Sequence, residues 1–460
     1  MPPAPNILLA YYGDDFTGST DVMEALARQG VKTVLFVEPP GPAQLARVPG
    51  LQAFGIAGGS RTMSPEEMQT GLPPAFAALK ASGAPIVHYK ICSTFDSSPN
   101  AGSIGAAIEI GQRIFGPMPT PLVVGAPALG RYMAFGNLFA RSGLDSEPAR
   151  LDRHPTMQRH PITPMDEADL RIHLSRQTSL PIHLIDLLQL ESGSWQKSLF
   201  SATAPPDPVP PILLFDTLNQ VHLRSIGEIL ERLVKQHRIL FCVGSSGLEY
   251  ALAAHGWPAG ALPPHSLSRA KPVRQLLTVS GSCSPVTQRQ IQRAVQAGFV
   301  ALPLSTNLIL NPETSRDEFQ TVTAEAMTAL REGKSVILHT SNGPDDPRIP
   351  ELTAALKQRN VTRSAEFLGQ ILGRLLRNIL PQAALSRIAI CGGDTSTHVA
   401  RGLDVEALDY VAPMAPGSPL CRMIAPNRGV DGLEVVFKGG QVGRDDFFLD
   451  VLAGGPPAET

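Results

Sequence analysis

The chain of 460 residues has no excess of one sign of charge. Lys and Arg number 39 against 41 Asp and Glu, which gives a formal net charge of -2. This balance offers no broad electrostatic surface for nucleic acid or for anionic lipid. We therefore expect neither as a partner, and any anionic ligand must be held by a local site.

Cysteine is also scarce. The chain has five cysteines, which are widely scattered and form no C-x-x-C pair. This odd number and spacing exclude a disulfide framework and a structural zinc site. We assign no residue to a protein-bound metal.

Long apolar runs are absent. No stretch approaches the roughly 18 apolar residues of a membrane-spanning helix. The N-terminus, "MPPAPNILLAYYGDD", lacks a basic segment, and its apolar run is too short for a secretory signal. The expected protein is soluble, reduced and cytoplasmic, with no membrane partner.

What the chain does contain is an alternation of short apolar runs and longer amphipathic ones. Runs such as "NILLAYY", "PIVHYKI", "RILFCVG", "QLLTVSG" and "RIAICGG" predict strands, and "TDVMEALARQG" predicts a helix that ends at Gly30. This alternation indicates an α/β fold, in which each domain is a mainly parallel sheet covered by helices. The length favours two domains.

The Pro-, Gly- and Ser-rich text around residues 255–275 predicts the linker between these domains. We place the domains at 1–258 and 273–460 and the linker at 259–272. A cleft between two domains is the default place for an active site. A second loop-like segment, 140–180, has the length of a lid or substrate loop. Its His154, Arg159 and His160 could close over a ligand or be solvated loop residues.

Three predicted strands of the second domain are followed by small residues and then, in two of the three cases, by a helix. The glycines and hydroxyl residues of these turns are Ser280, Gly281, Ser282, Ser284, Gly392, Gly393, Asp394, Thr395, Ser396, Gly439, Gly440 and Gly443. Such turns lie together at the carboxyl edge of a parallel sheet, where backbone N–H groups and helix N-termini bind phosphate. One such turn alone is more often an ordinary helix N-cap, but three in one domain suggest a nucleotide.

Two other sequence patterns that could indicate phosphate binding do not meet the requirements of their motifs. "EGKS" at 332–335 ends like a Walker loop but lacks the upstream glycine and precedes a strand. No G-x-G-x-x-G motif follows the first strand, so a dinucleotide fingerprint is missing and a dehydrogenase is disfavoured.

The first domain has polar segments after its predicted strands: "GDDFTGSTD", "GGSRTMS" and "HYKICSTFDSS". Arginine matches a carboxylate with two hydrogen bonds, and lysine supplies a point charge. Candidate carboxylate-binding residues are Ser60, Arg61, Lys90, Ser93 and Thr94. Candidate residues for sugar hydroxyls are Asp14, Asp15 and Asp96.

These residues suit phosphoryl transfer to an alcohol, which needs positioning, charge neutralisation and a carboxylate that accepts the hydroxyl proton. Asp15 is our candidate for that base, and Asp14 would steer hydroxyls or Mg2+. The alternative for the Asp pair is a helix N-cap plus a turn residue. The alternative for Lys90 and Arg61 is a pair of solvated surface charges.

The segments "GDDFTGSTD" at 13–21, "SR" at 60–61, "YKICSTFDSSPNAGSIG" at 89–105, "SGSCSPVTQRQ" at 280–290, "GGDTS" at 392–396, "APGSP" at 415–419 and "KGGQVGRDDFF" at 438–448 occur in one order along the chain. In this respect the sequence resembles the four-carbon acid sugar kinase family over nearly its whole length. The resemblance implies an N-terminal sugar-acid-binding domain and a C-terminal nucleotide-binding domain, with ATP and Mg2+ as cofactors.

By this resemblance, ATP binds at the second-domain turns, and the sugar acid binds near Asp14, Asp15, Arg61, Lys90 and Asp96. The implied nucleotide-binding residues are Ser280, Ser282, Gly392, Gly393, Asp394, Thr395, Gly417 and Gly440. The "CSTFDS" string is similar to the branch acting on 3-oxo-tetronates. The sequence at 128–140 differs from the sequence typical of that branch. Both a linear 3-oxo-tetronate and a branched acid such as 3-oxo-isoapionate are therefore expected candidate substrates.

The expected activity is ATP-dependent phosphorylation of the terminal hydroxyl of such an acid to its 4-phosphate. Two alternatives stay open: an erythronate or threonate kinase, and a non-catalytic sugar-acid sensor. Because dimers are the commonest oligomers, a homodimer is the expected assembly.

Overall fold

The computed structural model describes residues 6–141, 146–159, 163–197, 209–257, 269–361, 364–427 and 429–457, with only the backbone described for Asp394. The chain divides into two compact units. Unit 1 comprises Met1–Thr33 and Glu38–His265, and unit 2 comprises Val34–Val37 and Ser266–Thr460. Most of the predicted linker, 259–268, lies outside the described residues.

Unit 1 is built on a parallel sheet with the strand order β3-β1-β4-β11-β5-β10-β9. These strands are β1 (Leu9–Gly13), β3 (Ala53–Ala57), β4 (Ile86–Lys90), β5 (Thr120–Val123), β9 (Ile182–Ile185), β10 (Ile212–Phe215) and β11 (Leu240–Gly244). The central strands are buried along their whole length. This explains their near-continuous apolar text, since helices cover a parallel sheet on both faces.

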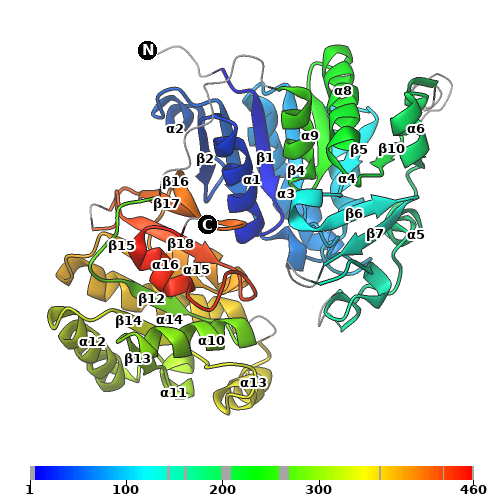
Figure 1. Ribbon diagram of the computed structural model, residues 1–460. Helices are drawn as coiled ribbons and strands as arrows, with labels where there is room; N and C mark the ends of the chain where they lie inside the picture. Colours follow the sequence, from blue (N-terminus) through cyan, green and yellow to red (C-terminus); the bar gives the residue numbers. More distant parts are fainter. Residues whose placement is uncertain are drawn as a thin grey trace. The chain divides into compact units, whose positions relative to one another are not determined.

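Helices and short turns connect the strands of unit 1 (Figure 1). They are α1 (Phe16–Arg28), α2 (Pro42–Ala46), η1 (Ser60–Thr62), α3 (Pro65–Ala81), α4 (Ile104–Phe115), η2 (Pro127–Leu129), η3 (Leu151–Arg153), η4 (Met157–Arg159), α5 (Leu170–Ser175), α6 (Leu187–Ser192), α8 (Gln220–Gln236) and α9 (Gly247–His255). On β4, His88 bonds to Glu249 of α9, while the neighbouring Tyr89 packs against Phe76 of α3. Because side chains alternate along a strand, α9 and α3 cover opposite faces.

A small antiparallel sheet interrupts the α/β pattern of unit 1. Its strands are β6 (Arg131–Ala134), β7 (Asn137–Ala140) and β8 (Ala149–Arg150). It occupies part of the segment 140–180 that we expected to be a loop, and α5 occupies another part. The described part of this segment is therefore a loop only in part, and three of its apolar side chains are buried: Leu151, Met157 and Leu170 are each at most 6% exposed.

Unit 2 has the strand order β13-β14-β12-β15-β18-β17-β16-β2, parallel from β13 to β18 and antiparallel beyond. The strands are β2 (Thr33–Phe36), β12 (Leu277–Ser280), β13 (Val300–Pro303), β14 (Val336–His339), β15 (Arg387–Cys391), β16 (Ala407–Ala415), β17 (Ser418–Ile424) and β18 (Glu434–Lys438). Val34–Val37 thus lies in the early sequence but clusters with unit 2.

The helices of unit 2 form two groups, in which α10 packs with α16 and α14 packs with α12 and α15. They are α10 (Pro285–Gln296), α11 (Thr306–Leu310), α12 (Arg316–Arg331), α13 (Arg348–Gln358), α14 (Ser364–Ile379), η5 (Leu380–Gln382), α15 (Gly393–Gly402) and α16 (Phe447–Ala453). Part of the core lies between α10, α16 and the strands, and includes Ile291, Val436, Phe447 and Val451.

The α/β class with a mainly parallel sheet is confirmed. The predicted strands at the N-terminus and in both series are present, and "EGKS" follows the end of α12 as expected. Among the described helices, none has both the length and the apolar character needed to cross a bilayer.

Two helix glycines test how tightly unit 1 is packed. A Cβ on Gly227 of α8 would lie 2.2 Å from the carbonyl oxygen of Ala251 in α9. A Cβ on the exposed Gly71 of α3 would instead contact the flexible side chain of Met63, at 3.4 Å. We expect Gly227→Ala to lower the free energy of unfolding by about 1–3 kcal/mol through overpacking. Gly71→Ala should raise it by about 0.5–1 kcal/mol, since alanine favours the helix. Urea unfolding of the two variants measures both effects, and a neutral Gly227→Ala would contradict the close packing of α8 and α9.

Candidate functional site

The first candidate site lies where the parallel strands of unit 1 end. The register pairs Gly13 of β1 with Ala57 of β3 and with Lys90 of β4, and it pairs Lys90 with Gly244 of β11. The segments that follow these strands therefore meet at one edge, where open α/β sheets bind ligands. The N–H of Asp14 donates to the carbonyl of Lys90 at 2.9 Å, which ties two of these segments together.

Arg61 holds both carboxylates of the adjacent aspartate pair. Its Nη2 lies 2.7 Å from Oδ1 of Asp14 and 2.8 Å from Oδ1 of Asp15, and its Nε donates to Oδ2 of Asp14 at 3.2 Å. The Asp14 and Asp15 side chains are only 4% and 12% exposed. Two like charges buried this close together need a cation, and the guanidinium supplies it.

Asp15 is at the same time the N-cap of α1. Its Oδ1 accepts the N–H of Gly18 at 2.9 Å, and its Oδ2 accepts the hydroxyl of Thr17 at 2.7 Å. Burial alone would raise the pKa of Asp15, but Arg61 and the Thr17 hydroxyl outweigh it, and the pKa is lowered. For Asp14 burial dominates and raises the pKa in spite of Arg61. Asp15 is therefore the more acidic of the two groups.

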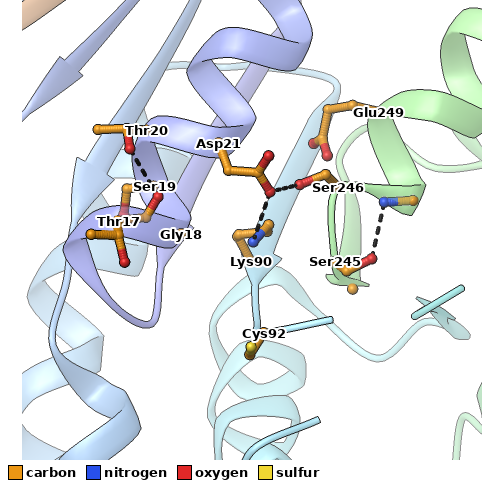
Figure 2. A network of polar contacts seen from close by, with 12 residues as sticks. Thr17, Gly18, Ser19, Thr20, Asp21, Lys90, Cys92, Ser245, Ser246 and Glu249 are labelled. Carbon is orange, nitrogen blue, oxygen red and sulfur yellow. Dashed lines mark hydrogen bonds and ion pairs between the residues drawn. The ribbon is translucent and has the colours of Figure 1, made fainter. Parts of the chain in front are cut away.

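A second polar network surrounds the ammonium of Lys90 (Figure 2). Lys90 is 3% exposed, and its Nζ lies 3.5 Å from Oδ2 of Asp21 in α1. The same carboxylate oxygen accepts the hydroxyl of Ser246, which precedes α9. Burial alone would lower the pKa of Lys90, but Asp21 and Asp14 more than offset it and the pKa is raised. The ammonium is thus a buried, charged group.

The turn after β4 carries three further candidates. The Thr94 hydroxyl donates to Oδ1 of Asp96 at 2.6 Å, and it therefore accepts the thiol proton of Cys92 at 3.0 Å. Burial and the charge of Asp96 raise the pKa of Cys92 to about 11, so this cysteine stays a thiol. Phe95, which stands between Thr94 and Asp96 in the sequence, has a φ angle of 59°, which is uncommon for a bulky residue. Ser93 in the same turn is half-buried.

Ser60 lies apart from these contacts. Its side chain is fully buried, and its hydroxyl lies 2.9 Å from the hydroxyl of Tyr89. Of the acid-site candidates, the structure brings Asp14, Asp15 and Arg61 into direct contact, and it places Lys90 at the end of a strand adjacent to theirs. Their roles remain predictions.

Asp21 and Ser246 were not among the predicted site residues. Asp21 closes the quoted segment "GDDFTGSTD", one helical turn beyond Thr17, so helix periodicity could have placed it beside the strand ends. Ser246 lies in "CVGSSGLEY", which has the same order of strand, small residues and helix that we used as a phosphate signal in the second domain. Applying that signal to both halves of the chain would have found it.

The second candidate site lies where β12, β15 and β18 of unit 2 end. The register pairs Ser280 with Cys391 and Cys391 with Lys438. Gly392 precedes α15 with φ 123°, a conformation that favours glycine, and its N–H donates to the carbonyl of Lys438 at 2.9 Å. In the described structure nothing lies within 4 Å of a Cβ built on Gly393, so the N-terminus of α15 faces open space.

The turns after these strands pack against one another. A Cβ on Gly281 would lie 2.7 Å from Oγ1 of Thr395, and a Cβ on Gly440 would lie 2.9 Å from Oγ of Ser282. These glycines let the turn after β12 approach the other two. Ser280 lies at the start of the turn after β12, where its hydroxyl accepts the N–H of Ser282 at 3.4 Å. The side chain of Asp394 lies outside the described residues.

Gly417 is located in the hairpin between β16 and β17, with φ 75°. Because β17 runs antiparallel to β18 with Leu420 opposite Val436, this hairpin lies at the edge where β18 ends. It therefore shares that edge with the phosphate-suited turns. Thr340 and Ser341, after β14, were missed as neighbours of these turns: their hydroxyls donate to the carbonyls of Ser280 and Ser282.

Among the three candidates in the segment 140–180, His154 departs from the solvated alternative. His154 is 4% exposed, and its Nδ1 accepts the N–H groups of Thr156 and Met157 at 3.2 Å. It stabilises the turn, and burial lowers its pKa. The alternative of a solvated histidine was wrong, because this ring is part of the local packing. Arg159 is exposed, and His160 lies outside the described residues.

Each half of the chain matches a known domain family. Residues 9–252 match the sugar-binding N-terminal domain family, and residues 277–448 match the nucleotide-binding C-terminal domain family. A 3-oxo-isoapionate kinase from Paraburkholderia graminis is 46% identical over 97% of this chain and 94% of that protein. A 3-oxo-tetronate kinase from Cupriavidus necator is 27% identical over 97% and 96%.

A crystal structure described as a putative tRNA synthase from Salmonella typhimurium has the same fold, with a TM-score of 0.74 and 23% identity over 96% of this chain and 98% of that one. The kinases among the relatives and the nucleotide-binding domain together imply the use of ATP. From these matches along nearly its whole length, the chain belongs to the four-carbon acid sugar kinase family and is a sugar-acid kinase.

Proposed function

We propose that this kinase transfers the γ-phosphoryl group of ATP to the terminal hydroxyl of 3-oxo-isoapionate and forms the 4-phosphate. The observation that carries this choice of substrate is the 46% identity, over nearly the full length, to a kinase named for that acid. The departure of residues 128–140 from the 3-oxo-tetronate branch supports a branched substrate. We assign the acid-binding role to residues 1–258, the nucleotide-binding role to 273–460 and the linker to 259–272.

In the first domain, we assign the substrate carboxylate to the two cations. Arg61 and Lys90 are 22% and 3% exposed in their side chains, so each charge is directed to a restricted site. Both can donate charge-assisted hydrogen bonds to a carboxylate. Ser93 and Thr94 would add hydroxyl contacts, and the free oxygen of Asp96 would accept a substrate hydroxyl.

Asp15 is the proposed acceptor of the hydroxyl proton. Its lowered pKa keeps it ionised at neutral pH. Phosphoryl transfer passes through a loose transition state and asks for little basic strength, so an acidic carboxylate suffices if it is well placed. Among the residues that the structure describes, its Oδ2 accepts a hydrogen bond from the Thr17 hydroxyl alone, which leaves a lone pair for the substrate.

In the second domain, the nucleotide phosphates are assigned to Ser282, Gly392, Gly393, Thr395 and Gly440, together with Ser280, Asp394 and Gly417 around them. Mg2+ prefers oxygen donors and is usually held by substrate phosphates, water and one or two carboxylates. Since Arg61 engages both Asp14 and Asp15, we assign Mg2+ to the nucleotide phosphates rather than to a protein cage. Bound there, it would neutralise the charge that develops on the phosphoryl group.

A substrate panel tests the proposed function. ADP release should be fastest, as kcat/KM, with 3-oxo-isoapionate, and slower with linear 3-oxo-tetronates, erythronate and threonate. The assay needs the purified chain, ATP, Mg2+ and each acid at several concentrations. If a linear 3-oxo-tetronate gave the highest kcat/KM, it would replace 3-oxo-isoapionate as the proposed substrate. Binding of an acid without turnover of any acid in the panel would favour a sugar-acid sensor.

Replacement of Asp15 tests the base. Asn is as good an N-cap as Asp, so Asp15→Asn should keep α1 and the affinity for ATP. It should lower kcat by about 10²- to 10⁴-fold, since a positioned proton acceptor contributes that much. Asp14→Asn is the matched variant; a larger kcat loss in Asp14→Asn than in Asp15→Asn would reverse the two roles.

Replacement of Asp21 tests the Lys90 network. Without its carboxylate, Lys90 loses its nearest ion-pair partner, and the ammonium should move or be less charged. We expect Asp21→Asn to raise KM for the acid by about tenfold, the cost of about one charge-assisted hydrogen bond, with KM for ATP unchanged. Ser246→Ala, which leaves the ion pair intact, should change KM for the acid less. Equal effects on both substrates would show that Asp21 acts only on stability.

A further inference from the structure

Lys438 is a buried charged residue that the mechanism above does not use. Lys438 is the last residue of β18, and its side chain is fully buried. Within the described part of the chain, no carboxylate lies within ion-pair distance of its Nζ. Burial accordingly lowers its pKa. An isolated buried cation is costly, so an unpaired one at a ligand site points to a negative group that the ligand brings.

Three neutral oxygens surround this ammonium. Its Nζ donates to Oγ1 of Thr287 at 3.0 Å, to the carbonyl of Gly439 at 2.9 Å and to the carbonyl of Gly440 at 3.3 Å. An ammonium has three protons, so each finds an acceptor. The lysine is therefore held in one position, and none of the described groups that accept its protons carries a charge.

These contacts also orient two peptide groups. In a planar trans peptide the N–H points opposite to the C=O. Since the carbonyls of Gly439 and Gly440 face the ammonium, the N–H groups of Gly440 and Gln441 face away from it. No acceptor for either N–H occurs among the described residues. Two successive free N–H groups form the kind of concave nest that binds anions.

Thr287 connects this turn to the turn after β12. Its hydroxyl donates to the carbonyl of Gly440 at 3.0 Å, and it therefore accepts from Lys438 and, at 3.1 Å, from the hydroxyl of Ser282. Gly440 has no room for a side chain, because a Cβ there would lie 2.9 Å from Oγ of Ser282. The ammonium, Thr287 and Ser282 thus fix two phosphate-suited turns relative to each other.

We propose that Lys438 is a positioning residue of the nucleotide-phosphate site, which holds the Gly439–Gly440 turn with two N–H groups outward and supplies a buried positive charge for the phosphates to neutralise. This inference rests on the proposed nucleotide-binding role of unit 2. Lys438 acts through the turn and through its field, since all three of its protons are used within the protein.

The test compares nucleotides of different charge on the full chain. Binding of adenosine, AMP, ADP and ATP is measured by calorimetry for the wild type and for Lys438→Gln, whose side-chain amide can still donate to carbonyls but carries no charge. We expect Lys438→Gln to weaken ADP and ATP by about ten- to hundredfold, the value of a hydrogen bond to a charged group, and adenosine by less than about twofold. The loss should shrink as KCl is raised, because salt screens the charge.

Two control variants separate charge from packing. Thr287→Val removes one acceptor and keeps the ammonium, so it should retain most of the preference for ADP over adenosine. Lys334→Gln makes the same substitution at an exposed lysine that pairs with Glu332, and should leave every affinity unchanged. Unchanged ADP binding in Lys438→Gln, or an equal loss for adenosine and ADP, would overturn the inference.

Failure of the underlying function gives a different result. A wild-type protein that binds neither ADP nor ATP would overturn the nucleotide-binding role and this inference with it. If circular dichroism shows that Lys438→Gln does not fold, Lys438→Arg provides the test instead, because it keeps the positive charge at the same position. The ratio of ADP to adenosine affinity should then stay within about tenfold of the wild-type ratio, and its collapse would rule out a role of the charge.

Discussion

The candidate site of unit 1 depends on the guanidinium of Arg61, which lies between two neighbouring carboxylates. Asp14 and Asp15 follow a fully buried strand, where two adjacent anions would repel each other and lose their hydration. Arg61 donates hydrogen bonds to both, and its backbone N–H also donates to the carbonyl of Asp14 at 3.0 Å. The segments after β1 and β3 are thereby fixed together, and the remaining polar groups of this edge are arranged around that contact.

The two candidate sites treat charge in opposite ways, and the difference fits their ligands. In unit 1 every buried cation of the site faces an anion of the protein: Arg61 faces Asp14 and Asp15, and Lys90 faces Asp21. The cations of this candidate site are thus already paired within the protein, and its carboxylates can accept the hydroxyls of a small sugar acid. In unit 2 the described partners of the buried Lys438 ammonium are hydroxyl and carbonyl oxygens and the Phe447 ring, none of them charged, which suits a polyanion such as a nucleotide phosphate chain.

Local patterns in the sequence predicted the strands, the α/β class and the turns that carry the candidate residues, because burial and turn chemistry leave a short-range signal. They did not predict contacts made by tertiary packing. The pairing of Val34–Val37 with β16 joins segments that are far apart in sequence. The buried hydrogen bond of Ser60 to Tyr89 depends on how η1 packs against β4. His154 resembles a solvated residue between prolines until its ring is seen to accept two backbone N–H groups.

Asp15 combines an observed structural role, as the N-cap of α1, with the proton-accepting role that we propose for it. As the N-cap it accepts hydrogen bonds from a backbone N–H and a hydroxyl of α1, and it also accepts a hydrogen bond from Arg61. These three bonds come from two separate segments and fix the carboxylate before any substrate arrives. A group that is already oriented needs no reorganisation during the reaction, which is the main way that a protein accelerates a transfer with little covalent chemistry of its own. The lowered basicity that the same bonds cause matters less, since the transition state of phosphoryl transfer depends more on placement than on base strength. An aspartate pair at the start of a helix, which costs stability when unpaired, is therefore a rational place to hold the acceptor of a hydroxyl proton.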